Sequence, residues 1–231
     1  VAEINSYSQQ IADLNGRIMA VQINPNQPPN DLLDARDALV SQLNQLVGTT
    51  VITQTDGSIN VVIGNGQNLV VGRQAMSLTA APGLDDPRRT DVGYVANGNT
   101  VLLNQGSLQG GSLGGLLAFR SNELDAAQNA IGRVALGIAQ TFNAQHSLGQ
   151  DLNGAMGGNF FSVSAPVVIG KSTNTGTAVV TAGVANTAAL TSSDYRLSYA
   201  GATYTVTRLS DGTTTSYATL PQTIDGADAV A

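Results

Sequence analysis

The sequence predicts an α+β fold, in which a helical bundle with one long helix and β-hairpins is followed by a mostly antiparallel β domain. Three observations predict this fold. Apolar residues recur at helical spacing near the N-terminus, and they do so again between Leu113 and Ser147. Between these stretches, and again after about Val163, the apolar period is two. We therefore expect an α-rich domain over residues 1–161 and a β domain over residues 162–231.

The N-terminal stretch predicts two helices joined as an αα-hairpin. A helix over Val1–Val21 is indicated by apolar residues at three- and four-residue steps or their multiples: Val1, Ile4, Tyr7, Ile11, Leu14 and Ile18. The proline-containing segment Asn24–Asn30 breaks this pattern. A second helix is expected over Asp31–Val47, capped by Asn30 and ended by Gly48.

Turn dipeptides then predict β-hairpins between residues 49 and 103. Asp56-Gly57, Asn65-Gly66 and Asn97-Gly98 are strong hairpin signals. The strands expected around them are Thr50–Gln54, Ser58–Ile63, Asn68–Val71, Val92–Ala96 and Thr100–Leu103. The charged, proline-broken segment Leu84–Thr90 is predicted to be a loop.

One long helix is predicted over Leu113–Ser147, with Ser112 as its N-cap. Its apolar stripe follows a heptad pattern, with members at Leu117, Leu124, Ala127, Ile131, Val134 and Ile138. We expect this stripe to pack against the preceding helical hairpin, so that Leu124→Ala or Ile131→Ala costs about 2–5 kcal/mol of stability. The nearly uncharged outer face favours packing against neighbouring subunits of a polymer.

The remaining residues predict the β domain. Asp151–Asn159 is a glycine-rich turn region, after which Phe160 or Phe161 is expected to anchor back on the α-rich domain. A hinge is then expected near Ser164–Pro166. The predicted strands are Val167–Ile169, Thr177–Val184, Tyr195–Tyr199, Thr203–Leu209 and Thr214–Ala218.

Composition argues against several classes of function. The net charge is −6, whereas proteins that bind nucleic acids or anionic membranes need basic patches. Cysteine is absent, which excludes disulfides and cysteine-ligated metals from this sequence. Only 11% of residues are charged, and neutral polar side chains replace them, as is common in secreted surface polymers.

Three candidate chemical sites have simpler structural interpretations. The glycine run Gly110–Gly115 opens a helix but lacks the Lys-Ser/Thr of a phosphate loop, so we expect it to permit a close backbone contact. His146 lies near a helix C-terminus, where the dipole favours it without any chemistry. The segment Asp151–Gly154 matches part of a calcium loop, but the ligand positions would fall on Gly149 and Phe160, which favours an Asx turn.

Two further groups suggest weaker alternatives. Carboxylates lie close together at Asp34 and Asp37, and again at Asp85 and Asp86, each group beside arginines (Arg36, Arg88 and Arg89), which would suit a glycoside hydrolase. For Asp34 and Arg36 we expect helix capping and inter-helix pairing instead. Tyrosines of the β domain could stack on sugars, as in an adhesin or carbohydrate-binding module: Tyr195, Tyr199, Tyr204 and Tyr217. We assign no catalytic, cofactor-binding or metal-binding residue.

The run SLGGLLAFRSNELDAAQNAIGR, followed by ALGIAQTFNAQHSLGQDLNGAMGGNFF, resembles the bacterial flagellar hook-associated protein 1 family. The resemblance extends back through Pro29–Val51 and Asp56–Gly72 and covers most of residues 1–161. Beyond about Val163 it becomes a general likeness to the outer β domains of axial flagellar proteins. The resemblance implies a central piece that lacks both terminal polymerisation segments and is therefore a soluble monomer alone.

The same resemblance implies a function. It suggests a secreted, non-enzymatic subunit of the hook–filament junction, outside the cell on the flagellum, with no cofactor. Residues 1–161 would line the tube wall and residues 162–231 would project outward. The implied partners are neighbouring copies in a ring, the hook protein and the second hook–filament junction protein. An export-chaperone site would lie in the missing C-terminal segment, and neither nucleic acid nor membrane is an expected partner.

Overall fold

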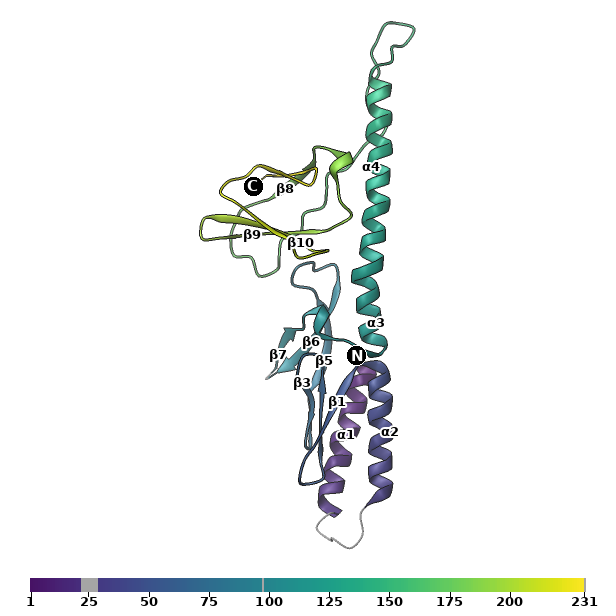
Figure 1. Ribbon diagram of the computed structural model, residues 1–231, viewed down its shortest axis with the longest axis vertical. Helices are drawn as coiled ribbons and strands as arrows, with labels where there is room; N and C mark the ends of the chain where they lie inside the picture. The colour runs from purple at the N-terminus through teal and green to yellow at the C-terminus, as the bar shows by residue number, and fades with distance from the viewer. Residues whose placement is uncertain (22–28, 97, 231) are drawn as a thin grey trace. The chain divides into compact units, whose positions relative to one another are not determined.

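The computed structural model describes residues 1–21, 29–96 and 98–230 (Figure 1). Its contacts group into two compact units, Val1–Arg120 with Lys171–Thr173, and Ser121–Gly170 with the chain from Asn174 onward. Each unit combines helix with antiparallel sheet, which confirms the predicted α+β class. Most of the expected connection Asn24–Asn30 lies outside the described residues, as does Asn97 of the third turn dipeptide.

Two helices open the first unit, α1 (Ala2–Val21) and α2 (Asn30–Leu46), and they lie side by side (Figure 1). The buried face of α1 includes the apolar residues that the sequence predicted: Ile4, Ile11, Leu14 and Ile18. The capping role predicted for Asn30 is wrong, because Asn30 is already helical and Pro29 precedes it without a side-chain cap. The amides of Leu32 and Leu33 donate instead to the Pro29 carbonyl.

Two antiparallel sheets complete the first unit. The first has the order β1 (Thr49–Thr53), β2 (Ile59–Ile63), β3 (Gln67–Val71) and β4 (Gln74–Ala75). The second has the order β5 (Ser77–Pro82), β6 (Thr90–Ala96) and β7 (Asn99–Leu102). The five predicted strands are present, with their ends shifted by up to two residues. Strands β4 and β5 were not predicted, because short segments rich in Ala, Ser and Gln carry little strand propensity.

The hydrophobic core of the first unit lies between its helices and the inner faces of its strands. Fully buried side chains come from α1, α2, β2 and β3, and they include Ile11, Leu43, Val61, Ile63 and Leu69. Residues of β2 alternate between buried and half-buried positions, as the period of two predicted. The helices and strands that pack around this core hold the start of the long helix in place.

The long helix is interrupted by a π-helical turn. It consists of α3 (Gly111–Phe119), the π-helical turn Arg120–Leu124, and α4 (Asp125–Ser147). A π turn accommodates an extra residue within a helix. In this chain the π-helical turn begins at Arg120. The Arg120 guanidinium donates to the Thr90 carbonyl at 2.7 Å and to the Asp91 carboxylate at 2.8 Å, and both acceptors belong to β6. The prediction of one uniform α-helix is therefore wrong at Arg120–Leu124.

The second unit contains two three-stranded antiparallel sheets. Their orders are β11-β10-β9 and β12-β13-β8, with bounds β8 (Thr181–Val184), β9 (Tyr195–Ala200), β10 (Thr203–Arg208), β11 (Thr214–Tyr217), β12 (Gln222–Ile224) and β13 (Ala227–Val230). The predicted strand Val167–Ile169 is wrong, and so is the first half of Thr177–Val184. A short apolar run forms a strand only where a partner strand pairs with it. No helix in the described part of the chain is long and apolar enough to span a membrane.

Candidate functional site

The glycine run at the start of α3 makes a close backbone contact. Gly111 has φ of +62°, and a Cβ there would lie only 2.5 Å from the carbonyl carbon of Leu46. The predicted close approach is therefore confirmed. Ser112 is not the N-cap as predicted, because Gly110 occupies that position and the Ser112 hydroxyl donates to the Gln45 carbonyl at 3.2 Å.

Arg36 lies in a buried polar network that joins α2 to α1. Its guanidinium donates to the Asn15 side-chain oxygen at 3.3 Å and to the Gly57 carbonyl at 2.8 Å. The Asn15 amide in turn donates to the carbonyls of Ile59 at 2.8 Å and Gly72 at 2.7 Å. Burial lowers the pKa of Arg36 from its ordinary value. The predicted inter-helix pairing is confirmed for Arg36.

The arginine contacts and lowered pKa of Asp86, and the exposure of Asp34 and Asp37, argue against a glycoside hydrolase. The Arg88 side chain donates to Asp86 from Nε at 3.0 Å and from Nη2 at 3.1 Å, and the Arg89 Nε atom lies 3.4 Å from the same carboxylate. The hydrogen bond from Arg88 holds the pKa of Asp86 below its usual value, whereas a general acid needs a raised pKa. Asp34 and Asp37 are exposed on α2, and since that helix has no side-chain cap, the predicted capping role of Asp34 is wrong.

Asp151 forms the predicted Asx turn. Its Oδ1 atom accepts hydrogen bonds from the amides of Asn153 and Ala155, both at 2.8 Å. These backbone bonds, first that from Ala155, lower the pKa of Asp151. His146 lies nearby, and its Nδ1 atom is 2.7 Å from the Gly158 carbonyl oxygen. In residues 1–21, 29–96 and 98–230 no group of three metal-ligating side chains occurs.

Three of the four candidate tyrosines share one face of the β9–β11 sheet. Tyr204 lies directly opposite Tyr199 on one neighbouring strand and Tyr217 on the other. The rings of Tyr199 and Tyr204 are 4.6 Å apart between centroids. Tyr195 is engaged differently, because its hydroxyl hydrogen-bonds to Asp225, which also accepts from the Arg208 guanidinium at 2.8 Å. That network ties the turn between β12 and β13 to this sheet.

The apolar stripe that runs from Leu124, at the end of the π-helical turn, along α4 is exposed in this chain, so its predicted burial is wrong. Leu124, Ile131, Val134 and Ile138 are between 51% and 71% exposed. Leu117 in α3 is the exception, since it belongs to the core of the first unit. The stripe therefore contributes little to the stability of the chain by itself.

The polar face of α4 makes the internal contacts instead. The Asn129 amide donates to the Ser192 carbonyl at 3.3 Å and to the Asp194 carboxylate at 3.0 Å. Arg133 donates to the Leu190 carbonyl at 3.1 Å. Specific hydrogen bonds thus orient the helix with its polar side towards the rest of the second unit and leave its apolar side to solvent.

An aromatic cluster lies near the end of α4, formed by Phe142, Phe160 and Phe161. Their ring centroids are 5.0 to 5.3 Å apart. Asn143 fastens the returning chain to the helix, because its side-chain oxygen accepts from the amides of Phe160 at 2.9 Å and Phe161 at 2.8 Å, and its amide donates to the Phe161 carbonyl at 2.8 Å. The predicted anchoring of Phe160 or Phe161 on the helix is confirmed. The role of Asn143 was not predicted, and no periodicity of the sequence marks it.

Comparison with known proteins identifies the family of this fold. The model of the flagellar hook-associated protein FlgK helical domain matches residues 1–161, and that of the hook-associated protein 1 D2-like domain matches residues 169–229. Flagellar hook-associated protein 1 of Salmonella typhimurium is 44% identical over 218 residues, and that of Escherichia coli is 41% identical over 216 residues. Each alignment covers 93% of this chain but only 39% and 40% of the relative.

A solved structure agrees with the sequence matches. The flagellar hook junction protein FlgK from Burkholderia pseudomallei is 40% identical and gives a TM-score of 0.89 over 99% of this chain. The alignment spans 42% of that protein, so this chain represents about two fifths of its relatives' length. The chain belongs to the flagellar hook-associated protein 1 (FlgK) family.

Proposed function

We propose that this chain is the central part of a structural subunit that joins the hook to the filament of the bacterial flagellum, and that it has no catalytic role. Membership of the family supports the proposal. The structural observation that carries it is the exposed apolar stripe of α4, because an exposed heptad stripe fits packing against further helices. In this proposal the stripe packs against helices of neighbouring subunits.

In this proposal the α-rich part and the β domain of the chain have different structural roles. Residues 1–161 form part of the tube wall, and residues 162–231 form an outer β domain. The subunit matches a flexible hook to a stiffer filament. Its partners are neighbouring copies in a ring, the hook protein and the second hook–filament junction protein. An export chaperone is a further partner, and the flagellar export apparatus carries the protein to the cell exterior.

Gene deletion and immunogold electron microscopy test the proposal together. Cells that lack the protein should build hooks but fail to retain filaments, and the full-length gene should restore them. Antibodies against residues 162–231 should label a single band between hook and filament. Filaments that persist in the deletion strain, or label spread along the whole filament, would contradict the proposed role.

A further inference from the structure

Charged side chains gather at one loop of the first unit, although only 11% of the residues of the chain are charged. This charged loop, Gly83–Asp91, joins β5 to β6 and includes the first two residues of β6. It contacts Arg120, where the chain leaves the first unit, and Lys171–Thr173, where the chain returns to that unit. The charged residues involved are Asp85, Asp86, Arg88, Arg89, Asp91, Arg120 and Lys171. One loop therefore holds two segments that are far apart in the sequence.

The charged loop is closed by its own hydrogen bonds. The Gly83 amide donates to the Arg89 carbonyl at 2.9 Å, and the Arg89 amide donates to the Asp86 carbonyl at 3.0 Å. The Asp86 carboxylate also accepts from the Arg88 amide at 2.9 Å and from the Arg88 side chain at 3.0 and 3.1 Å. The loop therefore keeps its shape by itself and gives the two segments a fixed support.

The first contact of the charged loop, at Arg120, is largely covered. The Arg120 guanidinium bonds to the Thr90 carbonyl and the Asp91 carboxylate, and the two charged side chains are only 21% and 16% exposed. Partial burial limits the screening of this ion pair by salt. The following residues, Ser121–Leu124, are exposed. Arg120 thus fixes the long helix at the start of the π-helical turn, and the rest of that turn lies in solvent.

The second contact of the charged loop, at Lys171 and Ser172, is weaker. The Ser172 amide donates to the Leu84 carbonyl at 3.1 Å, and the Lys171 Nζ atom lies 3.5 Å from the Asp85 carboxylate. The side chains of this ion pair are 47% and 54% exposed, so dissolved salt screens their attraction. Rising ionic strength should therefore release Lys171 and Ser172 before it releases Arg120.

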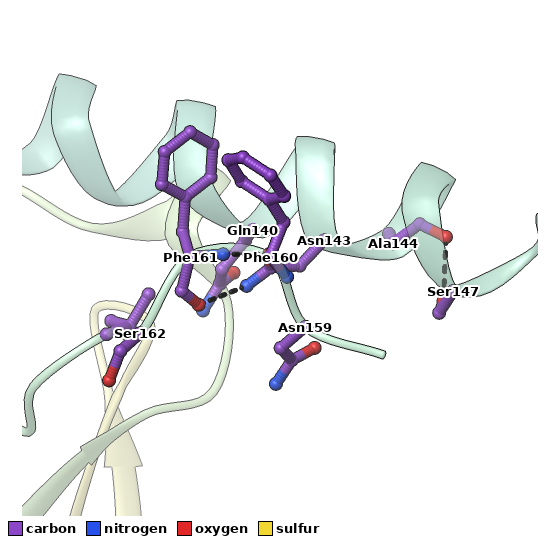
Figure 2. Close-up of a pocket in the computed structure, with 9 residues that line it drawn as sticks. Gln140, Asn143, Ala144, Ser147, Asn159, Phe160, Phe161 and Ser162 are labelled. Carbon is purple, nitrogen blue, oxygen red and sulfur yellow. Dashed lines mark hydrogen bonds between the residues drawn. The ribbon is translucent and has the colours of Figure 1, made fainter. Parts of the chain in front are cut away.

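The segment that carries Lys171 and Ser172 is long and irregular. Residues 162–180, all of which the structure describes, form neither helix nor strand. Connections of this length without regular structure are uncommon and are usually functional or linkers. The chain just before this segment is fastened to α4, because Asn143 forms hydrogen bonds with the backbone of Phe160 and Phe161 (Figure 2). Residues 162–180 therefore form a strap that is tied to α4 at its start and to the charged loop further along.

We propose that the charged loop is a two-stage ionic clasp that restricts the motion of the second unit relative to the first. With both contacts made, the helix at Arg120 and the strap at Lys171 are fixed to one rigid loop, and bending at the π-helical turn is restricted. Release of Lys171 and Ser172 gives the strap slack, and the helix then bends at the π-helical turn, a common place for helix kinks. The inference goes beyond the proposed function, because it concerns the single subunit before assembly.

Hydrogen exchange of the unassembled full-length protein tests the first stage. The exchange rate of the Ser172 amide is compared in about 0.01 M and about 1 M sodium chloride, between which the Debye length falls from about 30 to about 3 Å. We expect exchange about two- to fivefold faster at high salt, the range that one exposed ion pair supports. The Leu103 amide, which donates to the Val92 carbonyl, should exchange equally in both. Equal rates for Ser172 would overturn the proposal.

Matched substitutions assign the salt effect to one ion pair. Asp85→Asn keeps the shape of the side chain but removes its charge, so Ser172 should exchange fast at low salt and lose its salt dependence. Asp211→Asn is the control, because Asp211 pairs with Arg208 at a similarly exposed place outside the charged loop. This control should leave the exchange of Ser172 unchanged. The same change in both variants would contradict the role of Asp85 in the clasp.

Distances between spin labels test the second stage. Labels at Gln42→Cys on α2 and Ser198→Cys on β9, in a full-length protein without other cysteines, report the motion between the two units. High salt should broaden the distribution of distances in this labelled protein without any further substitution. Asp85→Asn should broaden it at low salt, and Arg120→Gln added to Asp85→Asn should broaden it further. Distributions of equal width under all these conditions would overturn the link between the clasp and bending.

Discussion

The same substitution at two isoleucines separates the core from the exposed stripe. Ile11 on α1 is fully buried, whereas Ile131 on α4 is 71% exposed. Ile11→Ala removes buried carbons from the core of the first unit and leaves a cavity, so it should lower the free energy of unfolding by about 2–5 kcal/mol. Ile131→Ala changes the same side chain in a helix but leaves no cavity behind.

The expected effect at Ile131 follows from its exposure. Full burial of an isoleucine side chain contributes about 1.5–3 kcal/mol, and less than a third of this side chain is covered. At most about 0.9 kcal/mol is therefore lost, and the higher helix propensity of alanine returns a few tenths. The net loss should stay below about 0.7 kcal/mol.

Urea unfolding followed by circular dichroism measures both variants of this chain. Hydrogen exchange of amides in α1 and α4 assigns each loss to its own unit. If Ile131→Ala cost 2 kcal/mol or more, the stripe would be covered in the isolated chain and would not face solvent. If Ile11→Ala cost nothing, Ile11 would not belong to the core of the first unit.

Three further changes test individual contacts. Asn15→Ala removes one hydrogen bond from the buried Arg36 guanidinium, which keeps its bond to the Gly57 carbonyl, and removes the side-chain partner of the Ile59 amide and carbonyl in β2. Urea unfolding should therefore show a loss of about 3 kcal/mol; a loss below about 1 kcal/mol would contradict this. Gly111→Ala places a Cβ against backbone at positive φ, and we expect a lower Tm in a thermal melt, whereas an unchanged Tm would mean that α2 and α3 are not in contact. A hydrogen bond from Tyr195 and a neighbouring arginine hold the pKa of Asp225 below its ordinary value. Stability from this carboxylate is therefore complete above about pH 4 and lost as pH falls through the folded-state pKa; Asp225→Asn should remove that acid dependence from unfolding curves of the β domain, and an unchanged dependence would contradict it.

The periodicity of the sequence was sufficient to find the main elements. Both helices of the hairpin, the long helix and the paired strands around the Asp-Gly and Asn-Gly turns are present where the pattern places them. Strands β12 and β13 were missed because they are only three and four residues long and lack a sustained alternation. The strand expected at Val167–Ile169 does not form, because an apolar triplet does not contain the information about its pairing partner.

The direction in which a helix packs was harder to predict. An apolar stripe identifies which residues share one face, but here Asn129 and Arg133 direct the opposite face inward through hydrogen bonds to backbone and carboxylate groups. Those bonds join residues about sixty positions apart, so no local pattern records them. The same holds for Asn143, whose importance depends on the returning chain at Phe160 and Phe161.

Thiol accessibility at Ile131 tests most directly whether the stripe of α4 is an assembly surface. The chain contains no cysteine, so Ile131→Cys introduces a single reporter in this region. Maleimide labelling, quantified on the peptide that contains residue 131, is compared between the isolated chain and assembled flagella carrying the full-length protein, with labelling in denaturant as the total. We expect rapid labelling in the isolated chain and strong protection in the flagellum. Equal labelling in both would contradict it.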